Sequence, residues 1–424
     1  MKKFLALIIA LVMALSLVAC GEQKQPDTPD VPDDGEQTAT IKVGFITLHD
    51  ENSTYDLNFI NAAKEAIANL GLTENDYILK TNIEEGQKCY DTAAELADAG
   101  CNIIFADSFG HESYMIQAAK DFPDVQFCHS TGTRAHTENL PNYHNAFASI
   151  YEGRYLAGIA AGMKMNEMIE AGKFTADEAK MGYVGAFTYA EVVSGYTSFY
   201  LGAKSVCPTV TMDVTFTGSW YDETLEKEGA QKLIDGGCKL ISQHADSLGA
   251  PTACENAGIP NVSYNGSTQA AGPNTYIISS RIDWAPYYEM AIKAVMDGTE
   301  IPVDYTGDLK TGSVVLTDLN TAVAAEGTQA AIDEAMAKLE NGELHVFDCS
   351  TFTTSVELNP FKTDFLKVDA DGHITSYLAD VDTDEAYTGD TEVITDGYFA
   401  ESTARSAPYF DLSIDGINLL DTKM

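Results

Sequence analysis

The chain has 424 residues, with 64 acidic side chains against 25 basic ones and a formal net charge of −39. This charge argues against nucleic acid as a partner, because phosphate binding needs a cationic stripe, and an anionic lipid surface would repel the folded body. Apolar residues make up 45% of the sequence and aromatic residues 10%, so the chain can fill the cores of two or three domains of ordinary size.

The N-terminus has the layout of an export signal. Lys2 and Lys3 precede an uncharged run that ends at Ala19 and is shorter than the ~20 residues that span a bilayer as a helix. Cys20 follows Leu-Val-Ala directly, a pattern similar to the bacterial lipobox, in which this cysteine receives a diacylglyceryl group and becomes the new N-terminus. We therefore expect residues 1–19 to be a removed signal peptide and Cys20 to be lipidated, so that lipid alone anchors an extracytoplasmic protein to the cell membrane. An ordinary cleaved signal that happens to end beside a cysteine is the alternative.

Residues 20–39 are expected to form a disordered acidic linker. Pro26, Pro29 and Pro32 stand among acidic residues, and such a composition cannot bury enough apolar surface to order itself. The folded part therefore begins near residue 40.

From there, apolar strand-like runs alternate with helical periods. The expected strands are 41–48, 102–106, 125–129, 181–187, 212–217, 239–243, 261–264 and 276–279. Helical patterns cover 89–99, 114–122, 152–169, 192–206 and 225–235. This alternation predicts an α/β fold with parallel sheets that helices cover on both faces.

A weak internal repeat divides this region. The sequence Ala-Asp-Ser-x-Gly occurs at 106–110 and again at 245–249, each time after Gly-Cys and a short apolar strand. Two similar lobes would place both loops at the carboxyl ends of parallel strands, where open sheets bind ligands, facing a cleft between the lobes. A five-residue echo can also arise by chance, so the repeat alone leaves duplication open.

The sequence changes character beyond residue 320. A helix-like stretch at 322–339 is followed by short β-type segments with turns at 341–342, 371–372 and 415–416. An acidic loop among them contains Asp380, Asp382, Asp384, Glu385 and Asp390. We expect a small α+β extension here.

Metal and catalytic motifs are missing from the sequence. The acidic loop lacks the turn glycine of a calcium site, with Glu385 in its place, so it is expected to be a solvated loop. The segment that begins at His111 has Met115 where a zinc-protease helix needs its second histidine. Walker, nucleophile-elbow and dinucleotide-binding sequences do not occur either. We expect no metal, no cofactor and no enzymatic activity.

Beyond Cys20 the sequence has cysteines without a C-x-x-C pair: Cys89, Cys101, Cys128, Cys207, Cys238, Cys254 and Cys349. Several stand in apolar, strand-like surroundings, so we expect small buried side chains. One disulfide remains open.

Aromatic residues recur beside carboxylates or amides where expected strands end. The residues that share this placement are Tyr55, Asp56, Phe109, Phe187, Glu191, Trp220 and Asp246. Aromatic faces can stack on a planar ligand while carboxylates and amides hydrogen-bond its edge, and burial strengthens those bonds. We therefore expect this set to bind a flat ligand. The alternative for each aromatic residue taken alone is core packing, and His244 is expected to end a buried strand.

Several longer segments suggest a family: Ser108-Phe109-Gly110, Tyr155-Leu156-Ala157-Gly158, Ala160-Ala161-Gly162, Glu191-Val192, Gly218-Ser219-Trp220-Tyr221-Asp222, Gln243-His244-Ala245-Asp246-Ser247, Glu401-Ser402 and Arg405-Ser406-Ala407-Pro408-Tyr409-Phe410. With them the chain resembles the basic membrane protein family of solute-binding lipoproteins, which serve ABC importers and include purine nucleoside receptors. The resemblance implies a type I periplasmic-binding-protein fold, with two Rossmann-like lobes that are joined by three hinge strands and close on a purine. It also implies an ABC permease and ATPase as partners, and we expect a monomer.

Two further ligand-binding candidates come from this resemblance. Asn265 stands where nucleoside-binding relatives have an aspartate that holds ribose hydroxyls, and an amide grips a diol less strongly than a carboxylate. Arg281 corresponds loosely to a lysine of those relatives. Residues 52–55 read Asn-Ser-Thr-Tyr where a branch similar to adenine binders has Gly-Trp-Thr-Tyr. Both departures keep a purine as the expected ligand and leave ribose open.

The expected domains are a first lobe at 40–155 plus 281–320, a second lobe at 156–280, and an extension at 321–424 packed on the lobes. The expected function is capture of a purine nucleobase or nucleoside for an ABC importer. A surface signalling or adhesion protein that reuses the fold is an alternative. A nucleoside-cleaving enzyme is a weaker one, because no catalytic motif supports it.

Overall fold

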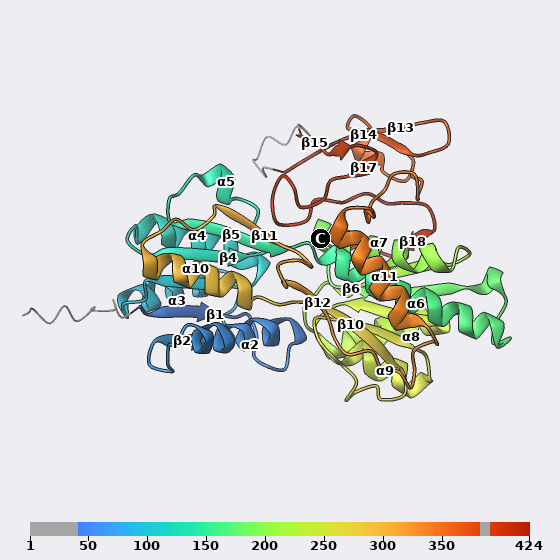
Figure 1. Cartoon of the computed structure of the whole chain (residues 1–424), viewed down its shortest axis with the longest axis horizontal. Coiled ribbons are helices and arrows are strands. Elements are labelled where there is room, and N and C mark those ends of the chain that lie inside the picture. Colours follow the sequence, from blue (N-terminus) through green and yellow to red (C-terminus); the bar gives the residue numbers. More distant parts are fainter. Residues whose placement is uncertain (1–40, 382–390) are drawn as a thin grey trace, which may run out of the picture. The chain divides into compact units, whose positions relative to one another are not determined.

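The computed structural model describes residues 41–381 and 391–424 (Figure 1). The expected signal peptide, the lipidation site Cys20 and the linker at 20–39 lie outside these residues. So do four members of the acidic loop, namely Asp382, Asp384, Glu385 and Asp390.

The first sheet runs in the order β11-β5-β4-β3-β1-β2, with its neighbouring strands parallel. Its strands are β1 (Val43–Ile46), β2 (Tyr77–Lys80), β3 (Ile103–Ala106), β4 (Gln126–Ser130), β5 (Tyr143–Ala148) and β11 (Asp304–Gly307). Its helices are α2 (Thr54–Asn69), α3 (Gln87–Asp98), α4 (Glu112–Asp121), α5 (Ala135–Glu138) and α10 (Ala285–Asp297). An apolar run such as β3 is buried along its length, as expected where helices cover both faces of a parallel sheet.

The second sheet runs in the order β12-β10-β9-β8-β6-β7-β18, and only the β10–β12 pairing within it is antiparallel among the described residues. Its strands are β6 (Lys180–Gly185), β7 (Thr211–Phe216), β8 (Leu240–His244), β9 (Asn261–Tyr264), β10 (Tyr276–Ile282), β12 (Val314–Leu316) and β18 (Ile417–Leu419). Its helices are α6 (Ile150–Glu170), α7 (Ala190–Val206), α8 (Glu223–Asp235) and α9 (Gly249–Ala257).

Between residues 41 and 381 the chain passes from one sheet to the other three times, after β5, after β10 and after β11. Two parallel-sheet lobes joined in this way confirm the expected α/β periplasmic-binding fold. Because β12 pairs with β10, the part of 281–320 that belongs to the first sheet ends with β11. We refer to the two sheets with their helices as the first and second lobes.

Glycines let two buried helices of the second lobe, α6 and α7, approach closely. A β-carbon at Gly158 would lie 2.1 Å from the carbonyl oxygen of Phe199, and one at Gly202 would lie 2.0 Å from that of Tyr155. Only a residue without a side chain fits at such distances. This contact explains the glycine of the Tyr155-Leu156-Ala157-Gly158 segment and fixes α7, whose first turn faces the other lobe.

The helix expected at 322–339 begins later than predicted. The helix α11 spans Thr328–Asn341, and its N-cap residue Gly327 has a φ of 81°. This left-handed conformation cannot continue a helix, and the preceding residues form turns in which Val323 and Ala324 donate to the carbonyl oxygen of Asn320. The expected start at residue 322 is therefore wrong.

The extension contributes short strands and packs on both lobes. Besides the 3-10 turn at Pro360–Lys362, it contains β13 (Leu366–Val368), β14 (Ile374–Ala379), β15 (Thr391–Glu392), β16 (Ile394–Thr395) and β17 (Tyr398–Phe399). Its apolar core is continuous with that of the second lobe; for example, Phe347 stacks on Phe410 at 4.4 Å and contacts Tyr151 of α6 at 5.4 Å between ring centroids. On the first lobe, Ser406 N donates to Asp304 of β11 at 3.0 Å.

The seven cysteines beyond Cys20 are buried and unpaired in the described structure. Within residues 41–381 and 391–424, no helix has both the length and the apolar character needed to cross a bilayer. No group of three or more His, Cys, Asp and Glu side chains in these ranges is arranged to hold a metal ion.

Candidate ligand-binding site

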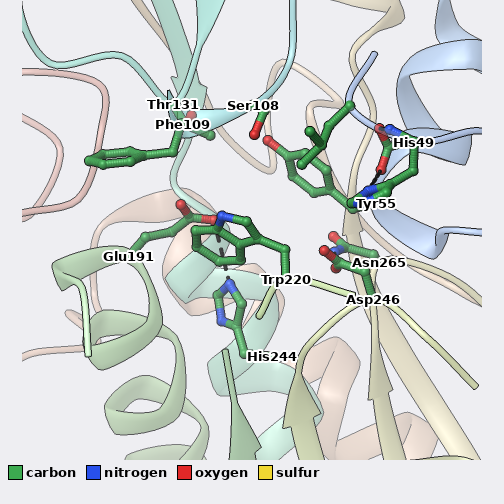
Figure 2. Close-up of a pocket in the computed structure, with 12 residues that line it drawn as sticks. His49, Tyr55, Ser108, Phe109, Thr131, Glu191, Trp220, His244, Asp246 and Asn265 are labelled. Carbon is green, nitrogen blue, oxygen red and sulfur yellow. Dashed lines mark hydrogen bonds and ion pairs between the residues drawn. The ribbon is translucent and has the colours of Figure 1, made fainter. Parts of the chain in front are cut away.

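A cavity lies where the carboxyl ends of strands from both lobes meet (Figure 2). Its empty space amounts to about 360 Å³, a figure that includes the open mouth of the cavity. The first lobe lines it with Leu48, His49, Tyr55, Asp56, Ser108, Phe109 and Thr131, and the second lobe with Glu191, Trp220, His244, Asp246 and Asn265. These residues lie at strand ends, in the loops that follow them or in the first turn of a helix, which is where open parallel sheets gather functional side chains.

Most of the residues expected from the sequence line this cavity: Tyr55, Asp56, Phe109, Glu191, Trp220, Asp246 and Asn265. Phe187 is not part of the lining. Its ring packs against Trp220 instead, at 5.1 Å between centroids. Arg281 is not part of the lining either. It lies near the end of β10, pairs with Asp283 at 3.3 Å and borders a separate groove beside α2.

Tyr55 is held rigidly on the first-lobe side. Its hydroxyl donates to the carbonyl oxygen of Asp107 at 2.7 Å, and its ring meets Phe59 at 4.8 Å between centroids. Burial, aided by the charge of Glu191, raises the pKa of Tyr55 well above its usual value. The hydroxyl therefore stays protonated, and the ring offers the cavity a fixed apolar surface.

Three aromatic rings of the second lobe, Phe187, Tyr189 and Trp220, form what we call the aromatic wall. Phe187 stacks on Tyr189 at 5.0 Å and meets Trp220 edge-on at 5.1 Å. Tyr189 in turn stacks on Phe109 of the first lobe at 5.2 Å, with the two ring planes 26° apart. Phe109 is 39% exposed, so the rings of both lobes meet at the rim of the cavity.

The floor of the cavity, on the second-lobe side, holds a neutral histidine, His244, beside the carboxylate of Glu191. His244 Nε2 lies 3.4 Å from Glu191 Oε1, and Figure 2 shows both residues on the Trp220 side of the cavity. Burial lowers the pKa of His244 although Glu191 opposes this, and the charge of Arg154 lowers it further. His244 is therefore neutral near pH 7, so one ring nitrogen donates and the other accepts.

Arg154 lies fully buried beneath this floor. It donates to the carbonyl oxygen of Ser263 at 3.0 Å and to the hydroxyls of Ser242 at 2.7 Å and Tyr183 at 3.2 Å. Its guanidinium also lies 5.2 Å from the ring centre of Tyr264, which packs on His244 at 4.3 Å. These neutral acceptors and π faces stabilise the buried charge.

Asp56 supplies a negative charge on the first-lobe side. It accepts hydrogen bonds from His49 N at 2.7 Å and from the hydroxyl of Ser53 at 2.6 Å. Burial opposes ionisation, but the hydrogen bonds from His49 and Ser53 outweigh it and lower the pKa of Asp56. This carboxyl group is therefore ionised near neutral pH.

Asp246 and Asp107 behave in the opposite way. Burial, with the nearby charge of Asp56, raises the pKa of each well above its usual value. Asn265 donates its amide to Asp246 at 3.0 Å. A carboxyl group that keeps its proton can donate a hydrogen bond as well as accept one, so Asp246 can meet either kind of ligand atom.

The two lobes touch directly beside the cavity. Thr54 N donates to the carbonyl oxygen of Asp246 at 3.0 Å, and the Asn58 amide donates to that of Asn265 at 2.6 Å. Both donors belong to α2 of the first lobe and both acceptors to loops of the second. The structure is therefore a closed arrangement of the lobes, in which the cavity is largely shielded from solvent.

Sequence reasoning did not single out Thr131, which also lines the cavity. It follows β4, has a φ of 70° and is 3% exposed. Its hydroxyl is buried without a hydrogen-bond partner among the described residues. A β-branched residue in the left-handed region is strained, and a single threonine after a strand carries no sequence pattern that would reveal it. His49 was missed for the same lack of pattern, whereas Ser108 belongs to the Ala-Asp-Ser-x-Gly loop at 106–110 that was expected to face the cleft.

Two parallel-sheet lobes that close over a cavity at their strand ends define a two-lobed solute-binding protein. A solved ABC transporter solute-binding protein from Aeropyrum pernix K1 has this fold, with a TM-score of 0.62, 18% identity, and coverage of 76% of this chain and 96% of that one. The chain belongs to the Bmp family, described as ABC transporter substrate-binding protein PnrA-like, whose sequence model matches residues 44–346.

Two named relatives differ in the ligand that their names give. A purine-binding protein of Brucella abortus (strain 2308) is 32% identical over 310 residues, which are 72% of this chain and 83% of that protein. A protein of Haloferax volcanii named for glucose binding in an ABC transporter is 34% identical over 259 residues, 61% of this chain and 62% of its own length. The protein is thus a substrate-binding protein of an ABC transporter, a class that works outside the cytoplasm and delivers small molecules to a permease and ATPase.

Proposed function

We propose that this protein captures a purine nucleobase or nucleoside in the cavity between its lobes and presents it to the permease of an ABC importer. The observation that carries the proposal is the combination of flat aromatic surfaces with carboxyl and amide groups in one buried cavity. The name of the Brucella abortus relative supports the same ligand class.

The lining fits the chemistry of a purine. A purine has two π faces and an edge that carries both donors and acceptors. In the proposal, Tyr55, Phe109 and Trp220 contact the faces, while Glu191, Asp246 and Asn265 bind the edge. Removal from water strengthens both kinds of contact.

A base fits this lining better than a nucleoside. The side chain of Asn265 already donates to Asp246, and an amide grips a ribose diol less strongly than a carboxylate does. The hydroxyl of Thr131 has no partner among the described residues, so it is available to a polar atom of the ligand. We therefore propose that adenine-like bases bind more tightly than their nucleosides.

The experiment is titration calorimetry on protein that has been unfolded, washed free of carried ligand and refolded. The panel contains adenine, guanine, hypoxanthine, adenosine, inosine, amino acids and glucose. We expect saturable binding of at least one purine. A folded, ligand-free protein that ignores every purine would refute the proposal, and binding of glucose alone would assign the ligand class of the Haloferax relative instead.

We further propose that Cys20 carries the lipid that keeps this protein near its permease. The variant Cys20→Ser keeps the size of the side chain but removes the thiol that would be acylated. We expect incorporation of an alkyne-labelled fatty acid to be lost and the protein to appear in the medium or periplasm with purine binding intact. Unchanged labelling of Cys20→Ser would contradict lipidation at this residue.

A further inference from the structure

The segment after β18 runs along the edge of the second sheet toward the aromatic wall. In the parallel pairing of β18 with β7, Ile417 faces Met212 and Leu419 faces Val214. Leu420 N then donates to the carbonyl oxygen of Val214 at 2.8 Å. We call residues 420–424 the tail. It continues the direction of β18, toward the carboxyl ends of the strands and thus toward the cavity.

Asp421 fixes the tail at the end of β7. One of its carboxylate oxygens accepts from Phe216 N at 2.7 Å, and the other accepts from the hydroxyl of Thr215 at 2.7 Å and from Lys232 Nζ at 2.9 Å. Burial opposes ionisation, but these hydrogen bonds lower the pKa of Asp421. The carboxylate thereby satisfies a backbone N–H at what would otherwise be an open sheet edge.

Lys423 then pairs with the middle of the aromatic wall. Thr188 N donates to the carbonyl oxygen of Lys423 at 2.7 Å, and Lys423 N donates to the hydroxyl of Thr188 at 2.9 Å. Thr188 stands between Phe187 and Tyr189, so the tail holds the backbone that carries both rings.

The side chain of Lys423 reaches the other segment of the wall. Its Cγ and Cδ atoms lie 3.6 Å from the point where a β-carbon of Gly218 would be. Gly218, with a φ of 76°, leads into Trp220, and its N–H donates to the carbonyl oxygen of Ala186 at 2.8 Å. One tail residue therefore contacts both loops from which the wall is built.

We propose that the tail is a positioning element of the binding site, and that the pairing of Lys423 with Thr188 sets the aromatic wall in place for a planar ligand. The part of the proposal that concerns ligand affinity rests on the proposed function. Without this pairing the loop at 187–189 loses two hydrogen bonds and gains conformational entropy. Ligand binding must then order the loop, and this entropy cost lowers the affinity. The tail lies outside residues 44–346, the range that the family model matches.

The test compares deletion of residues 422–424 and the variant Lys423→Pro with the control Met424→Pro. Proline lacks the N–H that donates to Thr188. The control places the same residue one position further on, where the side chain it replaces is 86% exposed. All variants also carry Trp284→Phe, because the chain has two tryptophans and Trp284 is buried in the first lobe, stacked on Phe59 at 4.5 Å. Trp220 is then the only tryptophan, and its fluorescence reports on the wall.

We expect the deletion and Lys423→Pro to increase quenching of Trp220 by acrylamide and to speed amide exchange at 187–189, with an unchanged circular dichroism spectrum. Affinity for adenine should fall about three- to tenfold, the range expected when weakly stabilising hydrogen bonds are lost. Met424→Pro should match the parent protein. Trp220 quenching and amide exchange that stay at the parent's values in both test variants would overturn the proposal. These two readouts need no ligand, so they decide it even if the protein binds no purine.

Discussion

The close approach of α6 and α7 predicts a large penalty for Gly202→Ala. The added β-carbon would lie 2.0 Å from the carbonyl oxygen of Tyr155 and 2.8 Å from its carbonyl carbon. Such contacts are essentially never shorter than 3.0 Å, and both partners are backbone atoms that cannot rotate away. The two helices must therefore move apart by about 1 Å in a close-packed interior.

The size of the effect follows from two opposing terms. Overpacking a core costs ~1–3 kcal/mol, and the backbone contact places Gly202→Ala at the upper end or beyond. Alanine returns at most ~1 kcal/mol through its better helix propensity. We expect a net loss of about 2 kcal/mol in the free energy of unfolding.

Gly229→Ala in α8 is the matched control. There the nearest atom to the new β-carbon is Val184 Cγ1 at 3.4 Å, an ordinary contact. Only the propensity term remains, so this variant should gain ~0.5–1 kcal/mol. The two alanine variants should thus differ by about 3 kcal/mol, with opposite signs relative to the parent.

Urea unfolding followed by circular dichroism measures this difference. Ligand affinity gives a second readout, because the first turn of α7 carries Glu191, and displacement of the helix should weaken binding in Gly202→Ala but not in Gly229→Ala. A Gly202→Ala protein as stable as Gly229→Ala would refute the argument that bare backbone contact sets the distance between the helices.

Three further predictions concern single residues. Trp220→Ala should weaken adenine binding in calorimetry by ~1–3 kcal/mol, the value of one stacked base on an aromatic side chain, while Trp220→Phe keeps most of the affinity; equal losses in both would contradict stacking. Asn265→Asp supplies a carboxylate for a ribose diol and should raise the affinity of adenosine relative to adenine, and a lower ratio would contradict that role. Burial raises the pKa of Glu226 from 4.5 to about 7, so the native state keeps a proton that the unfolded chain releases, and stability falls as the pH rises from 4.5 through 7. Glu226→Gln removes this dependence, so its stability relative to the parent should grow by about 2.5 kcal/mol between pH 5 and pH 8; a difference that stays constant with pH would contradict it.

The lobes could be predicted because their central strands are continuous apolar runs between helical periods. Strand β5 shows why the prediction was incomplete. It contains His144 and Asn145, polar residues that seldom mark a buried strand. Their partners lie on other segments, 10 to 158 positions away: His144 bonds to the carbonyl oxygen of Pro302 and to Gln126, and Asn145 accepts from Ala135 N. Only the folded structure supplies the hydrogen bonds that make these residues suitable for a core.

The sequence could predict those residues of the candidate site that directly follow a recognisable strand. Glu191, Trp220 and Asp246 follow strands whose apolar pattern is clear, so topology alone brings them together. The direction in which a side chain points near a strand end depends on the strand's register and on how the chain crosses between the lobes. The sequence alone could therefore not show that Arg281 points away from the cavity that the other candidates line. The pairing of Lys423 with Thr188 joins residues 235 positions apart and carries no local signal.

The buried thiols have a consequence for a protein that works outside the cytoplasm. Burial raises the pKa values of Cys128 in the first lobe and Cys254 in the second to about 12, and Cys349 lies buried in the extension. Thiolates, not thiols, react with oxidants and disulfides, so the native molecule is chemically inert at these positions. Local unfolding around one of these residues would expose its thiol to the compartment outside the cytoplasm, where disulfides can form and persist. Each such event can leave a covalent modification on the exposed thiol. The rate at which a thiol reagent modifies each cysteine therefore reports how often the structure around that cysteine unfolds.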